Sequence, residues 1–277
     1  MSEADQGQQP SLSDEILAGR LERFLSERSP AWEGKTAGQP LDLGDVFVRP
    51  EARRGGLVTR ITLDPTRVEA RLDELLHVIE GDGRRCLWVV GPSTRPADLG
   101  RHLLGRGFQQ RFELLGLALT DLSAAIPTNP EVVVEPLSPD NAPAYASRCT
   151  PSTDPRVHAY LLESAQRYLA QPRHEVEILV ARLRGEVAGY AVLRAEPTGL
   201  AFLCDAMTVP AFRRQGVYLS LLAHRLTLAR AAGCVAAVTH AQVQSSAPIL
   251  MKRGFRPISR VFGYSRPPAE SNAAGGG

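Results

Sequence analysis

Apolar residues along this chain recur at two spacings, one typical of amphipathic helices and the other typical of strands. Between Ser13 and Ser26 they lie three or four positions apart, which predicts one amphipathic helix. The polar face of this helix is not basic, so we expect it to pack on the body of the protein or on a partner subunit and not on a membrane. Residues 1–41 are therefore expected to hold a disordered tail and this helix.

Residues 42–122 are predicted to form a first unit of alternating strands and helices. The strands are expected at 46–48, 57–63, 86–90 and 112–119, and the helices at 65–79 and from Pro96. The longer helix carries a proline near its first turn, where a missing backbone N–H costs nothing. Residues 123–130, which are rich in Ser, Ala and Pro, are typical of a linker.

Residues 131–266 are predicted to form a second unit with the order strand, two helices, three strands, helix, strand, helix, strand. The strands are expected at 132–134, 176–183, 187–194, 200–209, 235–239 and up to Tyr264, and the helices around 140–148, 155–170, up to Ala231, and 246–252. Residues 267–277 (PPAESNAAGGG) are expected to be a disordered tail.

Composition narrows the functional classes. The net charge is +2, and almost every cation is arginine, with Lys35 and Lys252 as the only lysines. This bias is typical of a GC-rich bacterial genome, so the arginines between positions 49 and 54 are not interpreted as a nucleic-acid patch. No apolar run approaches the roughly 20 residues that span a bilayer, and we expect a cytoplasmic protein without membrane contact.

The four cysteines lie far apart and form no metal-ligand pattern. Cys86, Cys149, Cys204 and Cys234 show no C-x-x-C spacing, and three of them fall in or beside apolar strand-like runs. A small hydrophobic role is the default for such cysteines. Neither a metal site nor a disulfide framework is indicated.

A short cationic loop follows the strand predicted at 200–209 and leads directly into a helix. Arg213 and Arg214 supply positive charge, and Gly216 lets the backbone approach an anion closely. The first N–H groups of a helix lack intrahelical partners, and the helix dipole adds positive potential there. The pattern therefore predicts a phosphate site, whose expected contact residues are Met207, Thr208, Val209, Arg213, Arg214, Gln215, Gly216, Val217 and Tyr218.

The segment Val209-Pro210-x-x-Arg213-Arg214-x-Gly216-Val217-Tyr218 resembles the loop of the GNAT acyltransferase superfamily that holds the pyrophosphate of acetyl-CoA. The order of strands and helices in the second unit is also similar to that family. The resemblance implies an α/β (α+β) fold of tandem GNAT-like mixed sheets flanked by helices, with a complete C-terminal domain. It implies acetyl-CoA as co-substrate. Tyr218 departs from the family, which has Gly or Ala at this position.

The first unit echoes the back half of the second. Both place a short helix between a buried strand and a Gly-Phe pair, at Gly107 and at Gly254. The run W-V-V-G-P-S-T from Trp88 also resembles the non-catalytic N-terminal half of tandem-GNAT bacterial acetyltransferases. Where this unit should carry its phosphate loop, residues 63–68 contain no glycine but do contain an aspartate, which repels pyrophosphate. We therefore expect a degenerate N-terminal GNAT-like half.

Three residues are candidates for proton transfer. Asp205 lies within an otherwise apolar strand, where burying an unpaired carboxylate is costly. It is therefore either a general base or a residue that pairs with a nearby arginine or faces solvent. His240 follows the strand predicted at 235–239 and is either a base, a substrate contact or a hydrogen-bonded loop residue. Tyr264 is either a proton donor or a packing residue.

The resemblance implies two further features of the site. Backbone N–H groups near Val209 would polarise the acetyl oxygen, and Ser245 and Ser246 would lie near CoA unless they only cap a helix. The family commonly carries a tyrosine as general acid where this chain has Leu250. Tyr218 or Tyr264 could replace it, or the CoA thiolate could leave without an acid.

The resemblance favours an N-acetyltransferase that acts on an amine of a small molecule or a peptide by direct attack in a ternary complex. One alternative is a GNAT-fold enzyme with another acyl donor or acceptor, as in natural-product or thiol-cofactor biosynthesis. The other is a CoA-binding protein without turnover. The sequence does not identify the acceptor, and a homodimer is possible.

Overall fold

The computed structural model describes residues 12–26, 39–50, 55–81, 85–150, 152–170 and 176–267 of the chain. The tail expected at residues 1–10 lies outside this part, and so does the tail expected at residues 267–277 apart from its first residue. The predicted helix near the N-terminus is confirmed as α1 (Asp14–Ser26).

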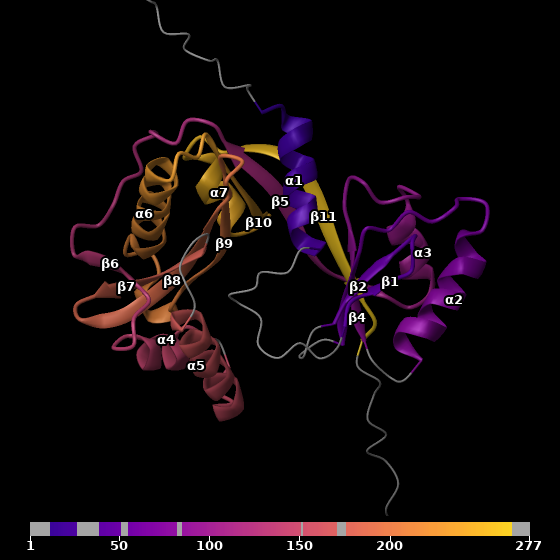
Figure 1. Cartoon of the computed structure of the whole chain (residues 1–277), viewed down its shortest axis with the longest axis horizontal. Helices are drawn as coiled ribbons and strands as arrows, with labels where there is room; N and C mark the ends of the chain where they lie inside the picture. The colour runs from indigo at the N-terminus through magenta and orange to yellow at the C-terminus, as the bar shows by residue number, and fades with distance from the viewer. Residues whose placement is uncertain are drawn as a thin grey trace, which may run out of the picture.

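Eleven strands in the described part of the chain form one mixed sheet (Figure 1). They are β1 (Leu41–Asp42), β2 (Phe47–Arg49), β3 (Gly56–Thr59), β4 (Cys86–Val90), β5 (Gln109–Leu119), β6 (Val132–Pro136), β7 (Val176–Leu183), β8 (Glu186–Ala195), β9 (Leu200–Thr208), β10 (Ala236–Gln242) and β11 (Arg256–Ser265). Their order across the sheet is β1-β2-β3-β4-β11-β5-β10-β9-β8-β7-β6. The pairs β3–β4 and β9–β10 are parallel.

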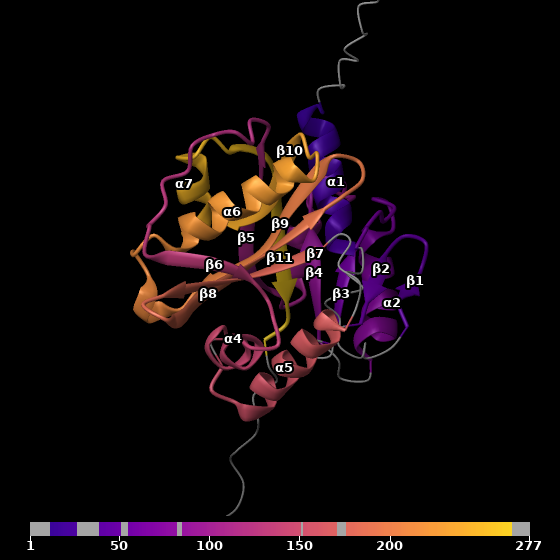
Figure 2. The same ribbon diagram turned by 60° about the vertical axis from the view of Figure 1, so that its left-hand side comes forward.

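Helices cover both faces of the sheet. The others in the described part are α2 (Val68–Glu80), α3 (Leu99–Gly105), α4 (Ala142–Arg148), α5 (Pro155–Leu169), α6 (Val217–Ala231) and α7 (Ser246–Met251). On one face, Leu222 and Leu226 of α6 pack with Leu203 of β9. On the other face, α1 covers the centre of the sheet, and α4 and α5 cover its β6–β9 end (Figure 2).

The two units predicted from the sequence exchange one strand each. β5 comes from the first unit but lies between β10 and β11 of the second, with Leu117 opposite Thr239 on one side and Pro257 on the other. Conversely β11, the last strand of the chain, inserts between β4 and β5 and places Tyr264 opposite Trp88. The final strand of each unit thus pairs with the parallel strands of the other unit: β11 lies beside β4, and β5 lies beside β10. One continuous sheet therefore runs through both units.

The helix α1 ties the two units together in the middle of the molecule (Figure 1). Its Leu17 and Leu21 are buried on the sheet. Glu22 accepts a hydrogen bond of 2.8 Å from the Ser93 hydroxyl in the first unit, and Asp14 pairs with Arg256 at the start of β11. The amphipathic pattern of this segment is therefore used for packing within the chain.

The exchange of strands predicts one cooperative unfolding transition for the whole described structure. Leu103→Ala removes a fully buried side chain from the first unit, and Leu222→Ala does the same in the second. Each substitution is expected to lower the free energy of unfolding by about 2–5 kcal/mol and to move the same transition. Urea unfolding, followed by circular dichroism and by tryptophan fluorescence, measures this.

The neighbouring Leu104→Ala serves as control, because Leu104 is 50% exposed and its truncation leaves no cavity. Two separate transitions, of which each buried variant moves only one, would show that the units fold independently.

Candidate functional site

The sheet opens between β9 and β10. These parallel strands pair only at Leu200 with Ala236, Ala201 with Ala237 and Phe202 with Val238. Beyond that point β9 continues along β8 while β10 continues along β5. The Thr239 hydroxyl donates a hydrogen bond of 2.7 Å to the Leu203 carbonyl at the start of the opening. The two strands therefore diverge in the middle of the sheet.

A bulge in β9 lies at this opening. Ala191 of β8 is opposite Ala206 and Leu193 is opposite Leu203, so Val192 alone faces the two residues Cys204 and Asp205. An extra residue of this kind bends a strand and changes the direction of its side chains, and it is common beside active sites. Asp205 and Ala206 are exposed although their strand lies between two others, so the sheet is uncovered here.

Asp205 lies in a recess beside aromatic side chains. Solvent reaches the carboxylate, yet enough protein surrounds it for desolvation to raise its pKa. Its charge in turn contributes to the raised pKa of Tyr145 and of Tyr190, which form an edge-to-face pair with ring centroids 5.3 Å apart. The carboxylate of Asp205 thus faces the side of the sheet covered by α4 and α5.

His240 lies on β10, the other strand that borders the opening. Burial lowers the pKa of its imidazole to about 4, so the ring is neutral at physiological pH. Its Nε2 is buried and has no hydrogen-bond partner within the described residues. Alternation along β10 places His240 on the same face as Val238, which packs with Phe202 beneath α1. Asp205 and His240 therefore border one opening on one face.

The loop between β9 and α6 presents a series of free amides. It contains a short 3-10 helix, Pro210–Phe212, and two left-handed residues, Arg214 with φ 62° and Gly216 with φ 81°. Within the described residues, the backbone N–H groups from Arg214 to Leu219 make no hydrogen bond, whereas the Ser220 N–H donates to the Gly216 carbonyl. Consecutive free amides in such a turn form a concavity for anions. Arg213 and Arg214 are exposed beside it.

Asn129 braces this loop from the segment predicted as a linker. Its side-chain amide donates a hydrogen bond of 2.8 Å to the Gln215 carbonyl, and its backbone N–H donates to the Ser220 hydroxyl at 3.2 Å. A Cβ at Gly216 would lie 2.8 Å from the Asn129 Cβ, so only glycine fits there. Asn129 was not predicted as a site residue, because an Asn-Pro pair between two units indicates only a turn.

The remaining predicted cofactor contacts differ in position. Met207 packs with the α4 and α5 cluster, and the Thr208 hydroxyl oxygen is buried without a partner in the described structure. The Val209 N–H donates to the Ala188 carbonyl at 2.8 Å, so this amide is not free to polarise an acyl oxygen. Ser245 is exposed, and the Ser246 hydroxyl accepts a hydrogen bond from the Gln242 N–H. Val217 is buried at the first position of α6.

The two tyrosines considered as proton donors, and the leucine at the family's tyrosine position, lie away from the solvent-exposed part of the opening. Tyr218 is partly buried against the core between α6 and the sheet. Leu250 is fully buried in that same core. Tyr264 lies in the core of the first unit, where its hydroxyl is close to Gly100 of α3. The structure thus separates Tyr264 from Asp205 and His240, because the exchange carries β11 into the first unit.

The corresponding place in the first unit is closed. The chain beyond β3 and β4 pairs again, with a bridge between Thr62 and Arg95 and a hydrogen bond of 2.9 Å from the Leu63 N–H to the Arg95 carbonyl. The Asp64 carboxylate accepts a hydrogen bond of 2.8 Å from the Thr66 N–H. An acidic side chain thus takes an amide that a phosphate loop would offer.

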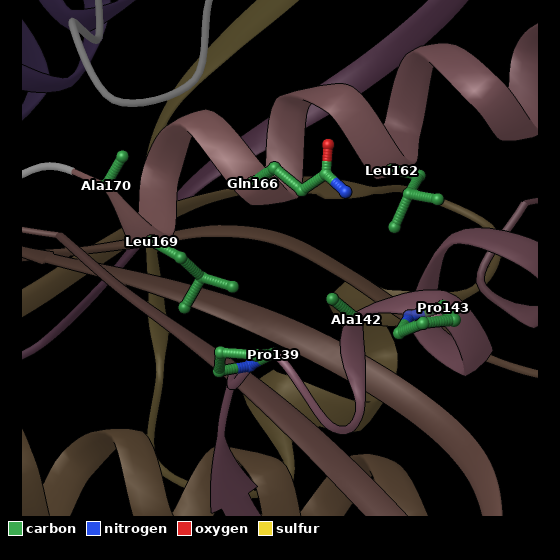
Figure 3. A pocket seen from close by; sticks show the side chains of 7 residues that line it. All are labelled: Pro139, Ala142, Pro143, Leu162, Gln166, Leu169 and Ala170. Carbon is green, nitrogen blue, oxygen red and sulfur yellow. The ribbon is translucent and has the colours of Figure 1, made fainter.

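A separate hollow of about 370 Å³ lies between α4 and α5 (Figure 3). Its lining is apolar except for one side-chain amide, and comprises Pro139, Ala142, Pro143, Leu162, Gln166, Leu169 and Ala170. It contains none of the predicted site residues. Elsewhere in the described residues, no cluster of three potential metal ligands occurs, and no helix has the length and apolar character to cross a bilayer.

One family model matches the part of the sequence that contains this opening. The sequence model of the acetyltransferase (GNAT) family matches residues 143–255, which run from α4 to the start of β11. Residues 143–255 form a GNAT domain. The match includes the opening between β9 and β10, the loop between β9 and α6, and α7, and the fold supports acyl transfer. Among curated proteins, none matches this sequence.

Solved structures share the fold over most of the chain. A GCN5-related N-acetyltransferase from Kribbella flavida has a TM-score of 0.61 at 15% identity, covering 95% of this chain and 98% of its own. Another from Sphaerobacter thermophilus has a TM-score of 0.61 at 17% identity, covering 85% and 84%. A tandem GNAT protein from the clavulanic acid biosynthesis pathway has a TM-score of 0.56 at 14% identity, covering 81% and 79%.

The buried imidazole of His240 makes stability depend on pH. Its pKa of about 4 in the folded protein lies below the ordinary value of 6.5, so the unfolded chain binds a proton first as the pH falls. The free energy of unfolding is therefore not reduced by this imidazole above pH 6.5. As the pH falls towards 4, protonation of the unfolded chain lowers the free energy of unfolding by about 3 kcal/mol at most. His240→Asn is expected to flatten this part of the pH profile, measured by urea unfolding.

His77→Asn is the matched control, since His77 is exposed on α2 and its replacement should leave the profile unchanged. Equal pH dependence in wild type and His240→Asn would show that the imidazole is not held neutral by burial.

Proposed function

We propose that this protein is an N-acyltransferase that moves the acetyl group of acetyl-CoA to an amine of a small molecule or a peptide. The observation that carries the proposal is the opening between β9 and β10. It has a loop of unpartnered amides at one end and the recessed carboxylate of Asp205 at its border.

The loop supplies the groups that a diphosphate needs. Its free N–H groups run from Arg214, through the left-handed Gly216, into the first turn of α6, and two arginines add charge. Gly216 leaves room for Asn129, whose side chain packs behind the loop and holds its backbone. Tyr218 is turned into the core and does not fill the loop. These residues fit the pyrophosphate of acetyl-CoA, which brings an activated thioester to the reaction.

Asp205 is the group best suited to take the proton from the ammonium. Desolvation raises its pKa towards the range in which a general base works efficiently at neutral pH. The ammonium gives one proton to the Asp205 carboxylate, and the amine nitrogen forms a bond to the acyl carbon. The carbon–sulfur bond then breaks, and the second proton that the nitrogen loses passes to solvent. His240, with a pKa of about 4, is a weak base and contributes a neutral ring that contacts substrate.

The leaving thiolate receives its proton from solvent in this proposal. Leu250 is fully buried and Tyr264 lies in the first unit, so neither position offers a phenol at the opening. A thiol is acidic enough, with a pKa of roughly 8.5 for cysteine, for its thiolate to leave without an acid.

The first unit acts as a scaffold in this proposal. Its strands β3, β4 and β5 repeat the arrangement of β9, β10 and β11, which supports a degenerate GNAT-like half. The bridge between Thr62 and Arg95 and the acidic side chain of Asp64 leave no second diphosphate site. The first unit also supplies β5, which pairs with β10 at the border of the opening.

A CoA-binding protein without turnover is the second candidate. Two observations favour it: the buried leucine at position 250, and the Val209 amide, which is already bonded to Ala188. Such a protein would bind acetyl-CoA through the same loop but transfer no acyl group. An enzyme with another acyl donor or acceptor also uses the same geometry.

Asp205→Asn tests the proposed function and separates the candidates. The affinity for acetyl-CoA, measured by calorimetry, should stay within twofold of wild type, because Asp205 lies outside the phosphate loop. Thiol release with a panel of amines (spermidine, glucosamine and a peptide with a free N-terminus) should fall about 10²–10⁴-fold in kcat. In wild type, activity should rise with pH as the carboxylate ionises, at an apparent pKa above the ordinary 3.8 of aspartate.

Asp140→Asn is the matched control, since Asp140 is exposed just before α4. Wild-type protein that binds acetyl-CoA but releases no thiol with these amines would favour the non-catalytic candidate. Full activity in Asp205→Asn would remove this residue from the mechanism.

A further inference from the structure

A completely internal arginine lies beneath the bulge of β9. Arg225 is on α6 and only 2% exposed. Its Nη1 donates hydrogen bonds of 3.3 Å to the carbonyl of Val192 on β8 and, at the same distance, to the carbonyl of Cys204 on β9. One side chain of the helix thus reaches both strands of the sheet at one point.

Those two carbonyls belong to the bulge itself. Val192 is the single residue that faces Cys204 and Asp205, where the regular pairing of β8 and β9 is interrupted. A bulge leaves backbone groups without partners in the ladder, and a buried carbonyl needs a donor from elsewhere. The guanidinium of Arg225 supplies donors to the carbonyl on each side of the interruption.

The fold alone does not explain an arginine at this position. Burial lowers its pKa, no carboxylate contributes to that pKa among the described residues, and its Nε is buried without a hydrogen-bond partner. Replacing a buried charge by an apolar side chain of similar size is often neutral or stabilising. The residues around it, such as Leu222 and Leu226 on the same helix, form an ordinary apolar core. The cost of burying this cation therefore indicates a role at the adjacent opening.

We propose that Arg225 is a positioning residue, which holds the bulge of β9 in shape and thereby sets the direction of the Asp205 carboxylate. The inference rests on the proposed function for its kinetic consequence, but its structural part concerns the bulge alone. Asp205 directly follows Cys204, so any relaxation of the Cys204 peptide turns the next residue.

Tyr218 links this arrangement to the phosphate loop. It lies in the first turn of α6, two residues after Gly216, and packs against the same core. The positive charge of Arg225 lies close enough to its hydroxyl to lower the tyrosine pKa, against the larger effect of desolvation. The bulky residue at this position thus contacts the internal arginine and leaves the concavity of the loop free.

Arg225→Met, Arg225→Lys and the control Arg230→Met test the inference. Arg230 is exposed near the end of the same helix. We expect Arg225→Met to melt no lower than wild type and to bind acetyl-CoA within about threefold, because the loop is intact. Its kcat should fall about 100-fold, as expected for a displaced catalytic group. Arg225→Lys keeps the charge and one donating nitrogen, so its kcat should be about tenfold higher than that of Arg225→Met, and Arg230→Met should match wild type.

Hydrogen exchange at the amides of residues 204–206 gives a second readout that does not depend on turnover. Exchange there should be faster in Arg225→Met than in wild type and unchanged in Arg230→Met. Wild-type exchange and kcat in Arg225→Met would overturn the inference. So would equal losses of melting temperature, affinity and kcat in both the methionine and lysine variants, which indicate a purely structural role. If wild type transfers no acyl group, the proposed function fails, whereas the exchange result still decides the role of Arg225.

Discussion

The parting of β9 and β10 is the constraint on which the rest of the structure depends. Two parallel strands in the middle of a sheet would normally remain paired, because each backbone N–H and carbonyl needs a partner. Here the pairing ends after Phe202 and Val238, and each strand continues on its other edge, β9 along β8 and β10 along β5. Since β5 belongs to the first unit, the opening exists only in the joined molecule. The first unit thus supplies one border of the opening in the second, while its own parallel strands pair again beyond β3 and β4.

Two local backbone features lie beside the opening, a bulge in β9 and a left-handed turn before α6. The bulge at Cys204 and Asp205 exposes a carboxylate on a strand that lies between two others. Arg225 donates a hydrogen bond to the Cys204 carbonyl, where the regular strand pairing is interrupted. The left-handed turn at Gly216 leaves a series of amides unbonded at the start of α6, and Asn129 keeps it in place. Both features hold strained or unpaired backbone through a side chain from another element. We therefore expect the site to be preorganised before any ligand arrives.

Local patterns in the sequence were enough to predict the elements and the loop. The apolar spacing located α1 and the strands of the second unit, and the arginines with Gly216 predicted the loop that the structure places after β9. Asp205 was recognisable because a carboxylate interrupts an apolar run. The start of α2 lies at Val68, three residues after the predicted position, because Asp64 and Thr66 form a turn there first.

Other features depend on contacts between distant segments. Nothing in the local pattern of β5 or β11 indicates that each pairs within the other unit, or that Tyr264 lies opposite Trp88. Arg225 is one of many arginines, and no spacing marks it as internal. Asn129 looks like part of a linker until its contact with Gln215 is seen. Pairing partners and buried polar contacts are tertiary properties, which is why sequence patterns alone did not locate them.

We propose that the loop before α6 binds the diphosphate of acyl-CoA, and calorimetric titration with acetyl-CoA measures this binding. Wild type should bind with micromolar affinity, roughly −8 kcal/mol. Arg214→Glu should abolish binding, because it places a negative charge beside the free amides. Arg230→Glu, near the far end of α6, should bind as wild type does. Absence of binding to wild type, or equal binding to all three proteins, would contradict the account.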